Sequence, residues 1–264
     1  MSEPELLTSL QDGAWWLVLN RPQKRNALSA RLVGELRAAL AAPPDGARAV
    51  VIRGAGGNLC AGGDVSDMLG AGPPPADGGP DPLAEMNRGY GRLLEEVESH
   101  PLPVVVVCEG AVMGGGFGLA CAADLSLGVD GARFRLPEVS LGITPAQIAP
   151  FLVRRLGLST ARRLALTGAD LGAEEALSIG LCHERVGPEG VDGALAATLA
   201  RLRRGEPGAL SATKALLLRT QVALGPLLDA AAADFATRAR GEAAAAGMTA
   251  FLTRSAPPWA AEGK

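Results

Sequence analysis

One stretch of the chain decides the fold: residues 104–118, which read VVVVCEGAVMGGGFG. The four valines Val104–Val107 are typical of a strand buried on both faces, because β-branched side chains pack well in a sheet that is covered on both sides. Three glycines, Gly114, Gly115 and Gly116, follow where a helix-like stretch opens. A strand, a glycine turn and a helix in this order predict an α/β fold.

A second glycine turn has the same plan. The strand-like residues 49–53 precede Cys60-Ala61-Gly62-Gly63-Asp64, and a helix is expected to begin near Asp64, with that residue as its N-cap. A backbone without Cβ atoms can direct N–H groups at a ligand, and a helix N-terminus adds positive potential. Two such donor sites suit a carbonyl oxygen that gains negative charge during a reaction. The dinucleotide pattern G-x-G-x-x-G fails here, because the register that starts at Gly114 ends at Leu119.

The remaining elements are expected from periodicity and turn residues. Residues 70–82 are dense in Gly, Pro and Asp, which favours a mobile surface loop. The chain looks helical from residue 144 onward, and residues 207–264 are an Ala-rich helical stretch without a strand signal. We therefore expect an α/β body over residues 1–206 and a helical C-terminal region over residues 207–264. The other predicted elements are strands at 15–19, 125–129 and 133–136, a helix after Ser29 and a helix over 83–99.

Composition narrows the class of protein. The formal charge is −3, from 25 basic and 28 acidic residues, so nucleic acid and anionic lipid are not expected partners. No apolar run approaches the roughly 18 residues of a membrane span, and the acidic N-terminus does not resemble a signal peptide. The four cysteines form no CxxC pair and only two histidines are present, so we expect reduced thiols, no metal site and a cytoplasmic location.

Taken together, five motifs resemble the enoyl-CoA hydratase/isomerase (crotonase) superfamily, with matching order and separations over about residues 10–185. The resemblance implies a spiral of ββα turns that assembles as a homotrimer or a dimer of trimers, and residues 247–252 resemble the helical trimerisation region of that family. The motifs are Asn20-Arg21-Pro22 with Asn26-Ala27-Leu28, Cys60-Ala61-Gly62-Gly63-Asp64, Gly114-Gly115-Gly116, Phe134 with Pro137-Glu138, and Leu141-Gly142.

The resemblance also implies a site for an acyl-CoA thioester. The N–H groups of Gly63 and Gly115 would bind the thioester oxygen, and Glu138 would move a proton. The apolar neighbours of Glu138 predict a raised pKa for its carboxyl, since burial disfavours the charged form. No cofactor is expected, because CoA is part of the substrate. The other residues implied to bind substrate or CoA are Lys24, Arg25, Asn26, Ala27, Leu28, Ala61, Gly62, Asp64, Gly114 and Gly118, with Arg254 as a further phosphate contact.

One departure from the family concerns the acids. Hydratases of the best-known kind carry two glutamates, and this chain has Gly118 where the first would stand, while Glu138 matches the second. A single glutamate suffices for a double-bond isomerase, yet residues 141–150 resemble hydratase-like proteins from the catabolism of branched or terpenoid acids. The sequence therefore favours a hydratase-type lyase first, a Δ3,Δ2-enoyl-CoA isomerase second, and a non-catalytic acyl-CoA-binding protein third.

Several nearby residues have two interpretations each. Glu109 is expected at a strand end, with a second acid as the alternative. Gln147 is expected on a helix surface, with a role in holding water as the alternative. Met68, Leu69 and Met86 are candidates for the wall of an acyl pocket, although apolar residues at helical spacing more often belong to the core.

Overall fold

The chain folds around a six-stranded sheet. In this computed structural model, which describes residues 3–76, 78–219 and 225–258, β1 pairs antiparallel with β2 and the later neighbours are all parallel. A second sheet joins β5 (Ala111–Met113) to β7 (Arg133–Arg135) in parallel. The α/β prediction is thus confirmed. In spatial order the strands of the main sheet are β1 (Leu6–Gln11), β2 (Ala14–Leu19), β3 (Ala49–Gly54), β4 (Val104–Cys108), β6 (Leu125–Val129) and β8 (Glu184–Val186).

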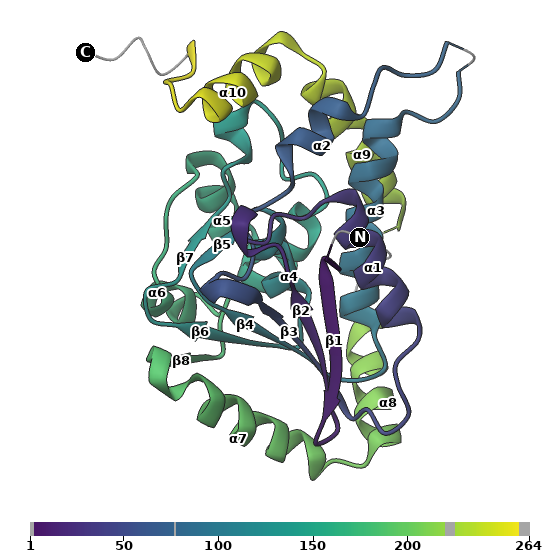
Figure 1. Cartoon of the computed structure of the whole chain (residues 1–264), viewed down its shortest axis with the longest axis vertical. Helices are drawn as coiled ribbons and strands as arrows, with labels where there is room; N and C mark the ends of the chain where they lie inside the picture. The colour runs from purple at the N-terminus through teal and green to yellow at the C-terminus, as the bar shows by residue number, and fades with distance from the viewer. Residues whose placement is uncertain (1–2, 77, 220–224, 259–264) are drawn as a thin grey trace.

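Helices cover both faces of this sheet, as Figure 1 shows. On one face Val104 and Val106 pack into the larger core, together with side chains of α1 and α3. On the other face Val105 and Val107 pack against Val191 and its neighbours on α7, which lies along the bottom of the view. Each of the four valines is at most 1% exposed, because successive strand side chains point to opposite faces and both faces are buried.

The predicted helices are present, with small shifts at their ends. Ser29 caps α1 by accepting a hydrogen bond from the backbone of Leu32, at 3.0 Å. Helix α5 is kinked at Gly157 (φ +74°) and ends at Gly168 in the left-handed conformation. The helices are α1 (Ala30–Ala41), α2 (Val65–Gly70), α3 (Pro82–Ser99), α4 (Gly115–Ala122), α5 (Ala149–Thr167), α6 (Ala173–Ser178), α7 (Val191–Arg203), α8 (Pro207–Leu218), α9 (Gly225–Ala239) and α10 (Glu242–Thr253), with short 3-10 turns η1 (Pro22–Lys24), η2 (Ala55–Gly57), η3 (Glu138–Leu141) and η4 (Pro188–Gly190).

Three strands were not predicted: β1, β5 and β8. Strand β1 forms one edge of the main sheet, and β8, in a region expected to be helical, forms the other. Five of the six residues of β1 are exposed, so its sequence lacks the apolar alternation that marks a strand. Strands β5 and β8 have three residues each, which is too short for a recognisable sequence pattern. They are defined by their hydrogen bonds, β5 to β7 and β8 to β6.

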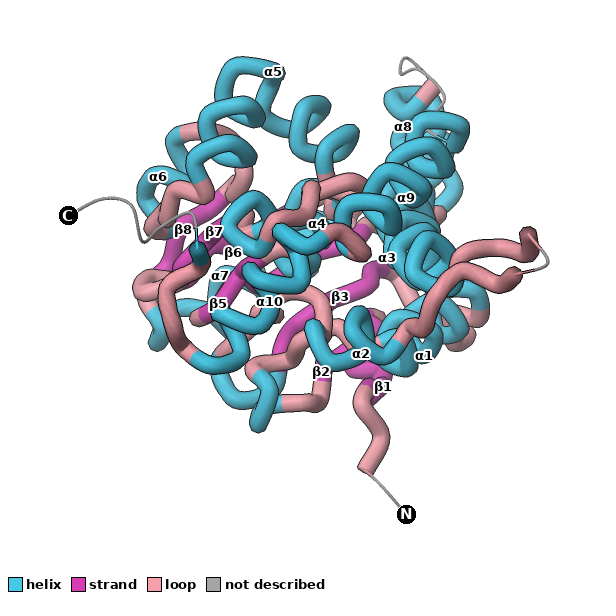
Figure 2. The backbone as a smooth tube through the Cα atoms, turned by 90° about the horizontal axis from the view of Figure 1, so that it is seen from above, coloured by secondary structure: helices cyan, strands magenta, loops and turns pink. Residues whose placement is uncertain are grey.

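The C-terminal helices lie on the body of the same chain. Helix α9 packs along α3, and α10 lies over the turn η3. The Nζ atom of Lys214, on α8, is 2.6 Å from the Oδ2 atom of Asp124. Seen from above in Figure 2, the loop between α2 and α3 projects from one side of the molecule. None of the helices in the described ranges is long and apolar enough to cross a membrane.

Candidate active site

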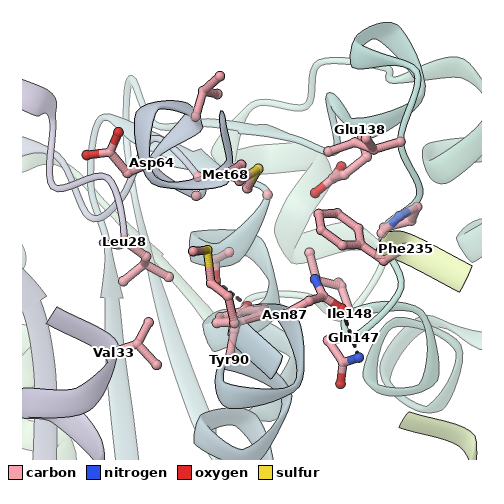
Figure 3. A pocket seen from close by; sticks show the side chains of 18 of the residues that line it. Leu28, Val33, Asp64, Met68, Asn87, Tyr90, Glu138, Gln147, Ile148 and Phe235 are labelled. Carbon is pink, nitrogen blue, oxygen red and sulfur yellow. Dashed lines mark hydrogen bonds between the residues drawn. The ribbon is translucent and has the colours of Figure 1, made fainter. Parts of the chain in front are cut away.

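A cavity of about 480 Å³ lies where the two glycine turns meet α1, α3 and η3. Figure 3 shows Leu28 and Val33 on one wall, Glu138 and Phe235 on the opposite wall, and Tyr90 between them. These side chains come from segments that are far apart in the sequence. The lining is largely apolar, which is typical of sites that take an organic ligand.

The two glycine turns lie side by side. The backbone of Cys60 accepts a hydrogen bond from Met113 N and donates one to Ala111 O, both at 2.9 Å. Gly62 has φ +107° and Gly114 has φ +48°, conformations that residues with a Cβ rarely adopt. A Cβ on Gly114 would be in ordinary contact with the Cα of Gly62, at 3.4 Å, and would crowd the carboxyl of Glu138.

Gly63 and Gly115 both line this cavity. The bridge between Leu28 and Gly63 uses the carbonyl of Gly62 (2.8 Å) and the N–H of Asp64 (2.9 Å), and so leaves the Gly63 N–H uncommitted. Gly115 is the first residue of α4, where a backbone N–H has no acceptor within the helix. Within the described residues, neither N–H has a hydrogen-bond acceptor. Two donors on one wall suit an oxygen that carries negative charge.

Glu138 is the first residue of η3 and lies beside the second glycine turn. Its Oε1 atom is 3.1 Å from the position of a Cβ on Gly114. The residue is only 8% exposed, and burial raises the pKa of its carboxyl to about 7. Within the described part of the chain, Oε2 has no hydrogen-bond partner. A buried carboxyl with a pKa near neutrality is suited to taking and returning a proton.

Most of the predicted site residues meet in this one cavity. Gly118 does not line it, and neither do Lys24, Asn26 and Ala27. Arg25 does line it. The predicted residues at the cavity wall are Arg25, Leu28, Ala61, Gly62, Gly63, Asp64, Gly114, Gly115 and Glu138.

Asn26 and Asp64 have roles in the fold. Asn26 is fully buried, and its side-chain amide accepts from Arg21 N (2.8 Å) and donates to two backbone carbonyls. Asp64 caps α2 as predicted, by accepting from Ser66 N at 3.1 Å. Its Oδ2 atom also lies 2.8 Å from Arg21 and 3.0 Å from Lys24, and in Figure 3 the carboxylate is turned away from Glu138. Contacts of this region with CoA stay a prediction.

The structure also places the residues that had two interpretations, and a role of Gln147 in holding water stays a prediction. Glu109 is a strand-end residue paired with Arg53 at 2.8 Å. The expectation that Gln147 lies on a helix surface is wrong: it is 1% exposed in the turn before α5, and its Nε2 atom donates to Asn87 Oδ1 at 2.9 Å. Met68 and Met86 line the cavity, whereas Leu69 is 52% exposed and does not.

Sequence reasoning missed Tyr90, the only tyrosine of the chain. It lies on α3 and its ring enters the cavity. Its hydroxyl donates a hydrogen bond to the backbone carbonyl of Gly115, at 2.7 Å. Tyr90 lies on an amphipathic helix, where an aromatic residue at helical spacing does not indicate a functional site. Only the packing of α3 against α4 brings it to the second glycine turn.

Comparison with known proteins gives one consistent result. The sequence profile of the family described as "Enoyl-CoA hydratase/isomerase" matches residues 10–262. The solved structure of Pseudomonas aeruginosa AtuE is similar at a TM-score of 0.77 and 48% identity, covering 97% of this chain and 99% of that one. The 2,3-dehydroadipyl-CoA hydratase of Escherichia coli K12 is 33% identical over 260 residues, 96% of this chain and 97% of that protein. The trans-2-decenoyl-[acyl-carrier-protein] isomerase of Streptococcus mutans is 29% identical over 226 residues, 84% of this chain and 85% of that protein.

Proposed function

The chain belongs to the enoyl-CoA hydratase/isomerase family and has the crotonase fold, and on that premise we propose that it is a hydratase-type lyase that adds water to a 2-enoyl-CoA thioester and removes it in reverse. The observation that carries this proposal is the buried carboxyl of Glu138, which lies beside the second glycine turn in the cavity that Gly63 and Gly115 also line. That arrangement can stabilise a thioester enolate and move one proton next to it.

In the proposed reaction the thioester oxygen accepts hydrogen bonds from Gly63 N and Gly115 N. As water adds to C3, negative charge moves onto this oxygen, and the two donors stabilise it. Each such donor contributes about 3 kcal/mol to the stability of a transition state of this kind. Glu138 takes the proton that the water loses and returns it to C2 of the enolate, so that the carboxylate is regenerated.

The single carboxyl beside the glycine turns supports an alternative, a Δ3,Δ2-enoyl-CoA isomerase. Moving a double bond requires the removal of a proton from C2 and its return to C4, which one carboxylate can do. The Streptococcus mutans relative is named an isomerase, and the Escherichia coli relative is named a hydratase. A protein that binds acyl-CoA without turning it over is the third candidate.

A branched or terpenoid acyl chain is the substrate that we propose. The segment 141–150 supports this, because it contributes Leu141, Ile143 and Ile148 to the cavity wall. Phe235, from α9, adds to the apolar surface there. Near the first glycine turn, the exposed guanidinium of Arg25 is available for a CoA phosphate, since arginine binds phosphate oxygens through charged hydrogen bonds.

We also propose assembly into a homotrimer or a dimer of trimers. Apolar side chains that a subunit contact would cover support it: Phe251 and Leu252 on α10 are 56% and 52% exposed, and Leu166 on α5 is 68% exposed. The mass of the assembly, from size-exclusion chromatography with light scattering, tests this separately from the activity.

The reaction is tested by mass spectrometry of CoA thioesters after incubation in heavy water with matched 2-enoyl and 3-enoyl substrates. The gain of one water, lost in Glu138→Gln, supports the hydratase. Conversion of 3-enoyl to 2-enoyl thioesters without added water supports the isomerase. If no thioester changes while CoA esters still bind, the protein is a binding protein.

A further inference from the structure

The place of the missing glutamate is occupied by another side chain. A Cβ on Gly118 would overlap the hydroxyl oxygen of Tyr90, and would also lie 3.2 Å from Ile148 Cγ1 and 3.3 Å from Leu94 Cδ1. No side chain can therefore begin at position 118 while Tyr90 keeps its position. Glycine at 118 and tyrosine at 90 form one arrangement, in which a phenol hydroxyl reaches the point where a carboxylate side chain would start.

Hydrogen bonding fixes the direction of this hydroxyl. It donates its one hydrogen to the carbonyl of Gly115 at 2.7 Å, and the ring atoms Cε2 and Cζ lie 3.5 and 3.6 Å from the position of a Cβ on Gly115. A hydroxyl oxygen has two lone pairs besides its hydrogen. Burial raises the pKa of Tyr90 well above its usual value, so the phenol stays neutral and its oxygen remains an acceptor.

Tyr90 and Glu138 face the same stretch of backbone. Glu138 Oε1 lies against Gly114, and the Tyr90 ring lies against Gly115, the next residue. Both side chains line the cavity, from η3 and from α3 (Figure 3). The start of α4 therefore has the Glu138 carboxyl against Gly114 and the Tyr90 ring against Gly115, and the Tyr90 hydroxyl lies one helical turn further along, at Gly118.

We propose that the hydroxyl of Tyr90 takes the place of the second carboxylate and accepts one hydrogen bond from the water that Glu138 activates. This inference rests on the proposed hydratase function. The water donates one hydrogen to Tyr90 and the other to Glu138. As the new C3–O bond forms, the O–H bond toward Glu138 breaks, the carboxylate takes that proton, and the proton is then delivered to C2. Tyr90 stays neutral throughout, and the sum of the steps is the addition of one water.

The proposal predicts that two activities respond differently to a change at Tyr90. Hydration needs the positioned water, whereas exchange of the C2 hydrogens of a saturated acyl-CoA in heavy water needs only Glu138 and the two N–H donors. The test measures both rates in Tyr90→Phe, which keeps the ring and loses the oxygen. We expect hydration to fall at least about tenfold, as for a lost hydrogen bond, and exchange to stay within about twofold of the unchanged protein.

A second measurement uses the fact that the chain has one tyrosine. Protein made with 3-fluorotyrosine carries the change at this position alone. Fluorine makes the phenol a stronger donor and a weaker acceptor, so we expect slower hydration and unchanged exchange. Circular dichroism and thermal unfolding check that both proteins fold.

Two outcomes overturn the proposal. One is hydration at the original rate in Tyr90→Phe. The other is an equal loss of hydration and exchange, which would mean that Tyr90 only supports the Gly115 backbone. Failure of the proposed function is distinct, since the unchanged protein would then hydrate no 2-enoyl thioester at all.

Discussion

Gly142 and Ala244 touch through their backbones. A Cβ on Gly142 would lie 2.9 Å from both the nitrogen and the Cα of Ala244, and Gly142 itself has φ +74°. Gly142 ends η3, the turn that Glu138 begins, while Ala244 lies in the first turn of α10. The C-terminal helix therefore rests directly on the segment that carries the candidate acid, and the position of Glu138 depends on a contact more than 100 residues away in the sequence.

The first prediction concerns this contact. Gly142→Ala places a Cβ on a left-handed backbone and makes it overlap the backbone of Ala244. We therefore expect a loss of about 1–3 kcal/mol in the free energy of unfolding. We also expect a lower kcat, because η3, which carries Glu138, must move. Denaturant titration and steady-state rates measure the two effects. Gly131→Ala is the matched control, since Gly131 has φ +87° and no heavy atom within 4 Å of an added Cβ. Equal destabilisation by both substitutions would show that the contact with α10 contributes nothing.

The second prediction is a pH profile. Burial raises the pKa of Glu138 to about 7, and the proposed reaction uses its ionised form. We expect kcat/KM for hydration to rise with pH and to reach half of its maximum near pH 7. In Glu138→Gln the rate should fall by about 10²–10⁴-fold, since the amide cannot take a proton. A rate that instead declines through pH 7 would mean that the protonated carboxyl is the active form.

The third prediction concerns the stability of the same variant. The pKa of Glu138 is raised above its ordinary 4.5 by burial, so its carboxyl favours the folded state at pH values below 4.5, and this contribution is lost as the pH rises through 7. Glu138→Gln has no such loss. We expect the variant to be more stable than the unchanged protein at pH 8, by up to about 3 kcal/mol, and close to it at pH 4.5. Urea titrations at the two pH values make the comparison; a lower stability of the variant at pH 8 contradicts the expectation.

The fourth prediction concerns Asp64. Burial alone would raise its pKa, but hydrogen bonds from Arg21 and Lys24 outweigh burial and hold the pKa of this carboxyl below its usual value. The resulting stability is present above the usual pKa and is lost as the pH falls through the lowered one. We expect Asp64→Asn to lose about 1–3 kcal/mol at pH 7, and progressively less below pH 4.

A surface pair provides the control for Asp64. Asp192→Asn removes a carboxylate that is 89% exposed and lies 3.3 Å from Arg53. Exposed pairs contribute about 0–1 kcal/mol, so this variant should unfold almost as the unchanged protein does. Unfolding free energies measured between pH 2 and pH 7 test this prediction. If Asp64→Asn and the unchanged protein had the same pH dependence of stability, the lowered pKa of Asp64 would not contribute to the stability of the fold.

The fifth prediction concerns the second glycine turn. A Cβ on Gly115 would lie 2.6 Å from Leu28 Cδ1, so Gly115→Ala must displace the cavity wall or the N–H donor. We expect kcat to fall by about 10–10³-fold, as when an oxyanion donor is lost. Gly193→Ala, in the first turn of α7 with open space around an added Cβ, should leave kcat unchanged. Wild-type kcat in Gly115→Ala would remove Gly115 from the proposed mechanism.

The sequence by itself determined the features that are encoded locally. The valine run predicted a fully buried strand, and Val104–Val107 form β4 in the interior. The glycine turns could be recognised because the backbone has a positive φ at Gly62 and Gly114, which favours glycine. Glu138 was found because its place after Pro137 belongs to a motif with a fixed order, and the apolar side chains around it predicted the direction of its pKa shift.

Only the tertiary structure decided the rest. The edge strands β1 and β8 exist through pairing with β2 and β6, and Gln147 is buried because α9 supplies a carbonyl for its amide. In the same way, Tyr90 covers Gly118 because α3 packs on α4. Each of these depends on contacts between segments distant in the chain, whereas periodicity and turn chemistry report only on neighbours within a few residues. The sequence therefore identified a glycine at position 118, and the packing of α3 on α4 places the hydroxyl of Tyr90 against it.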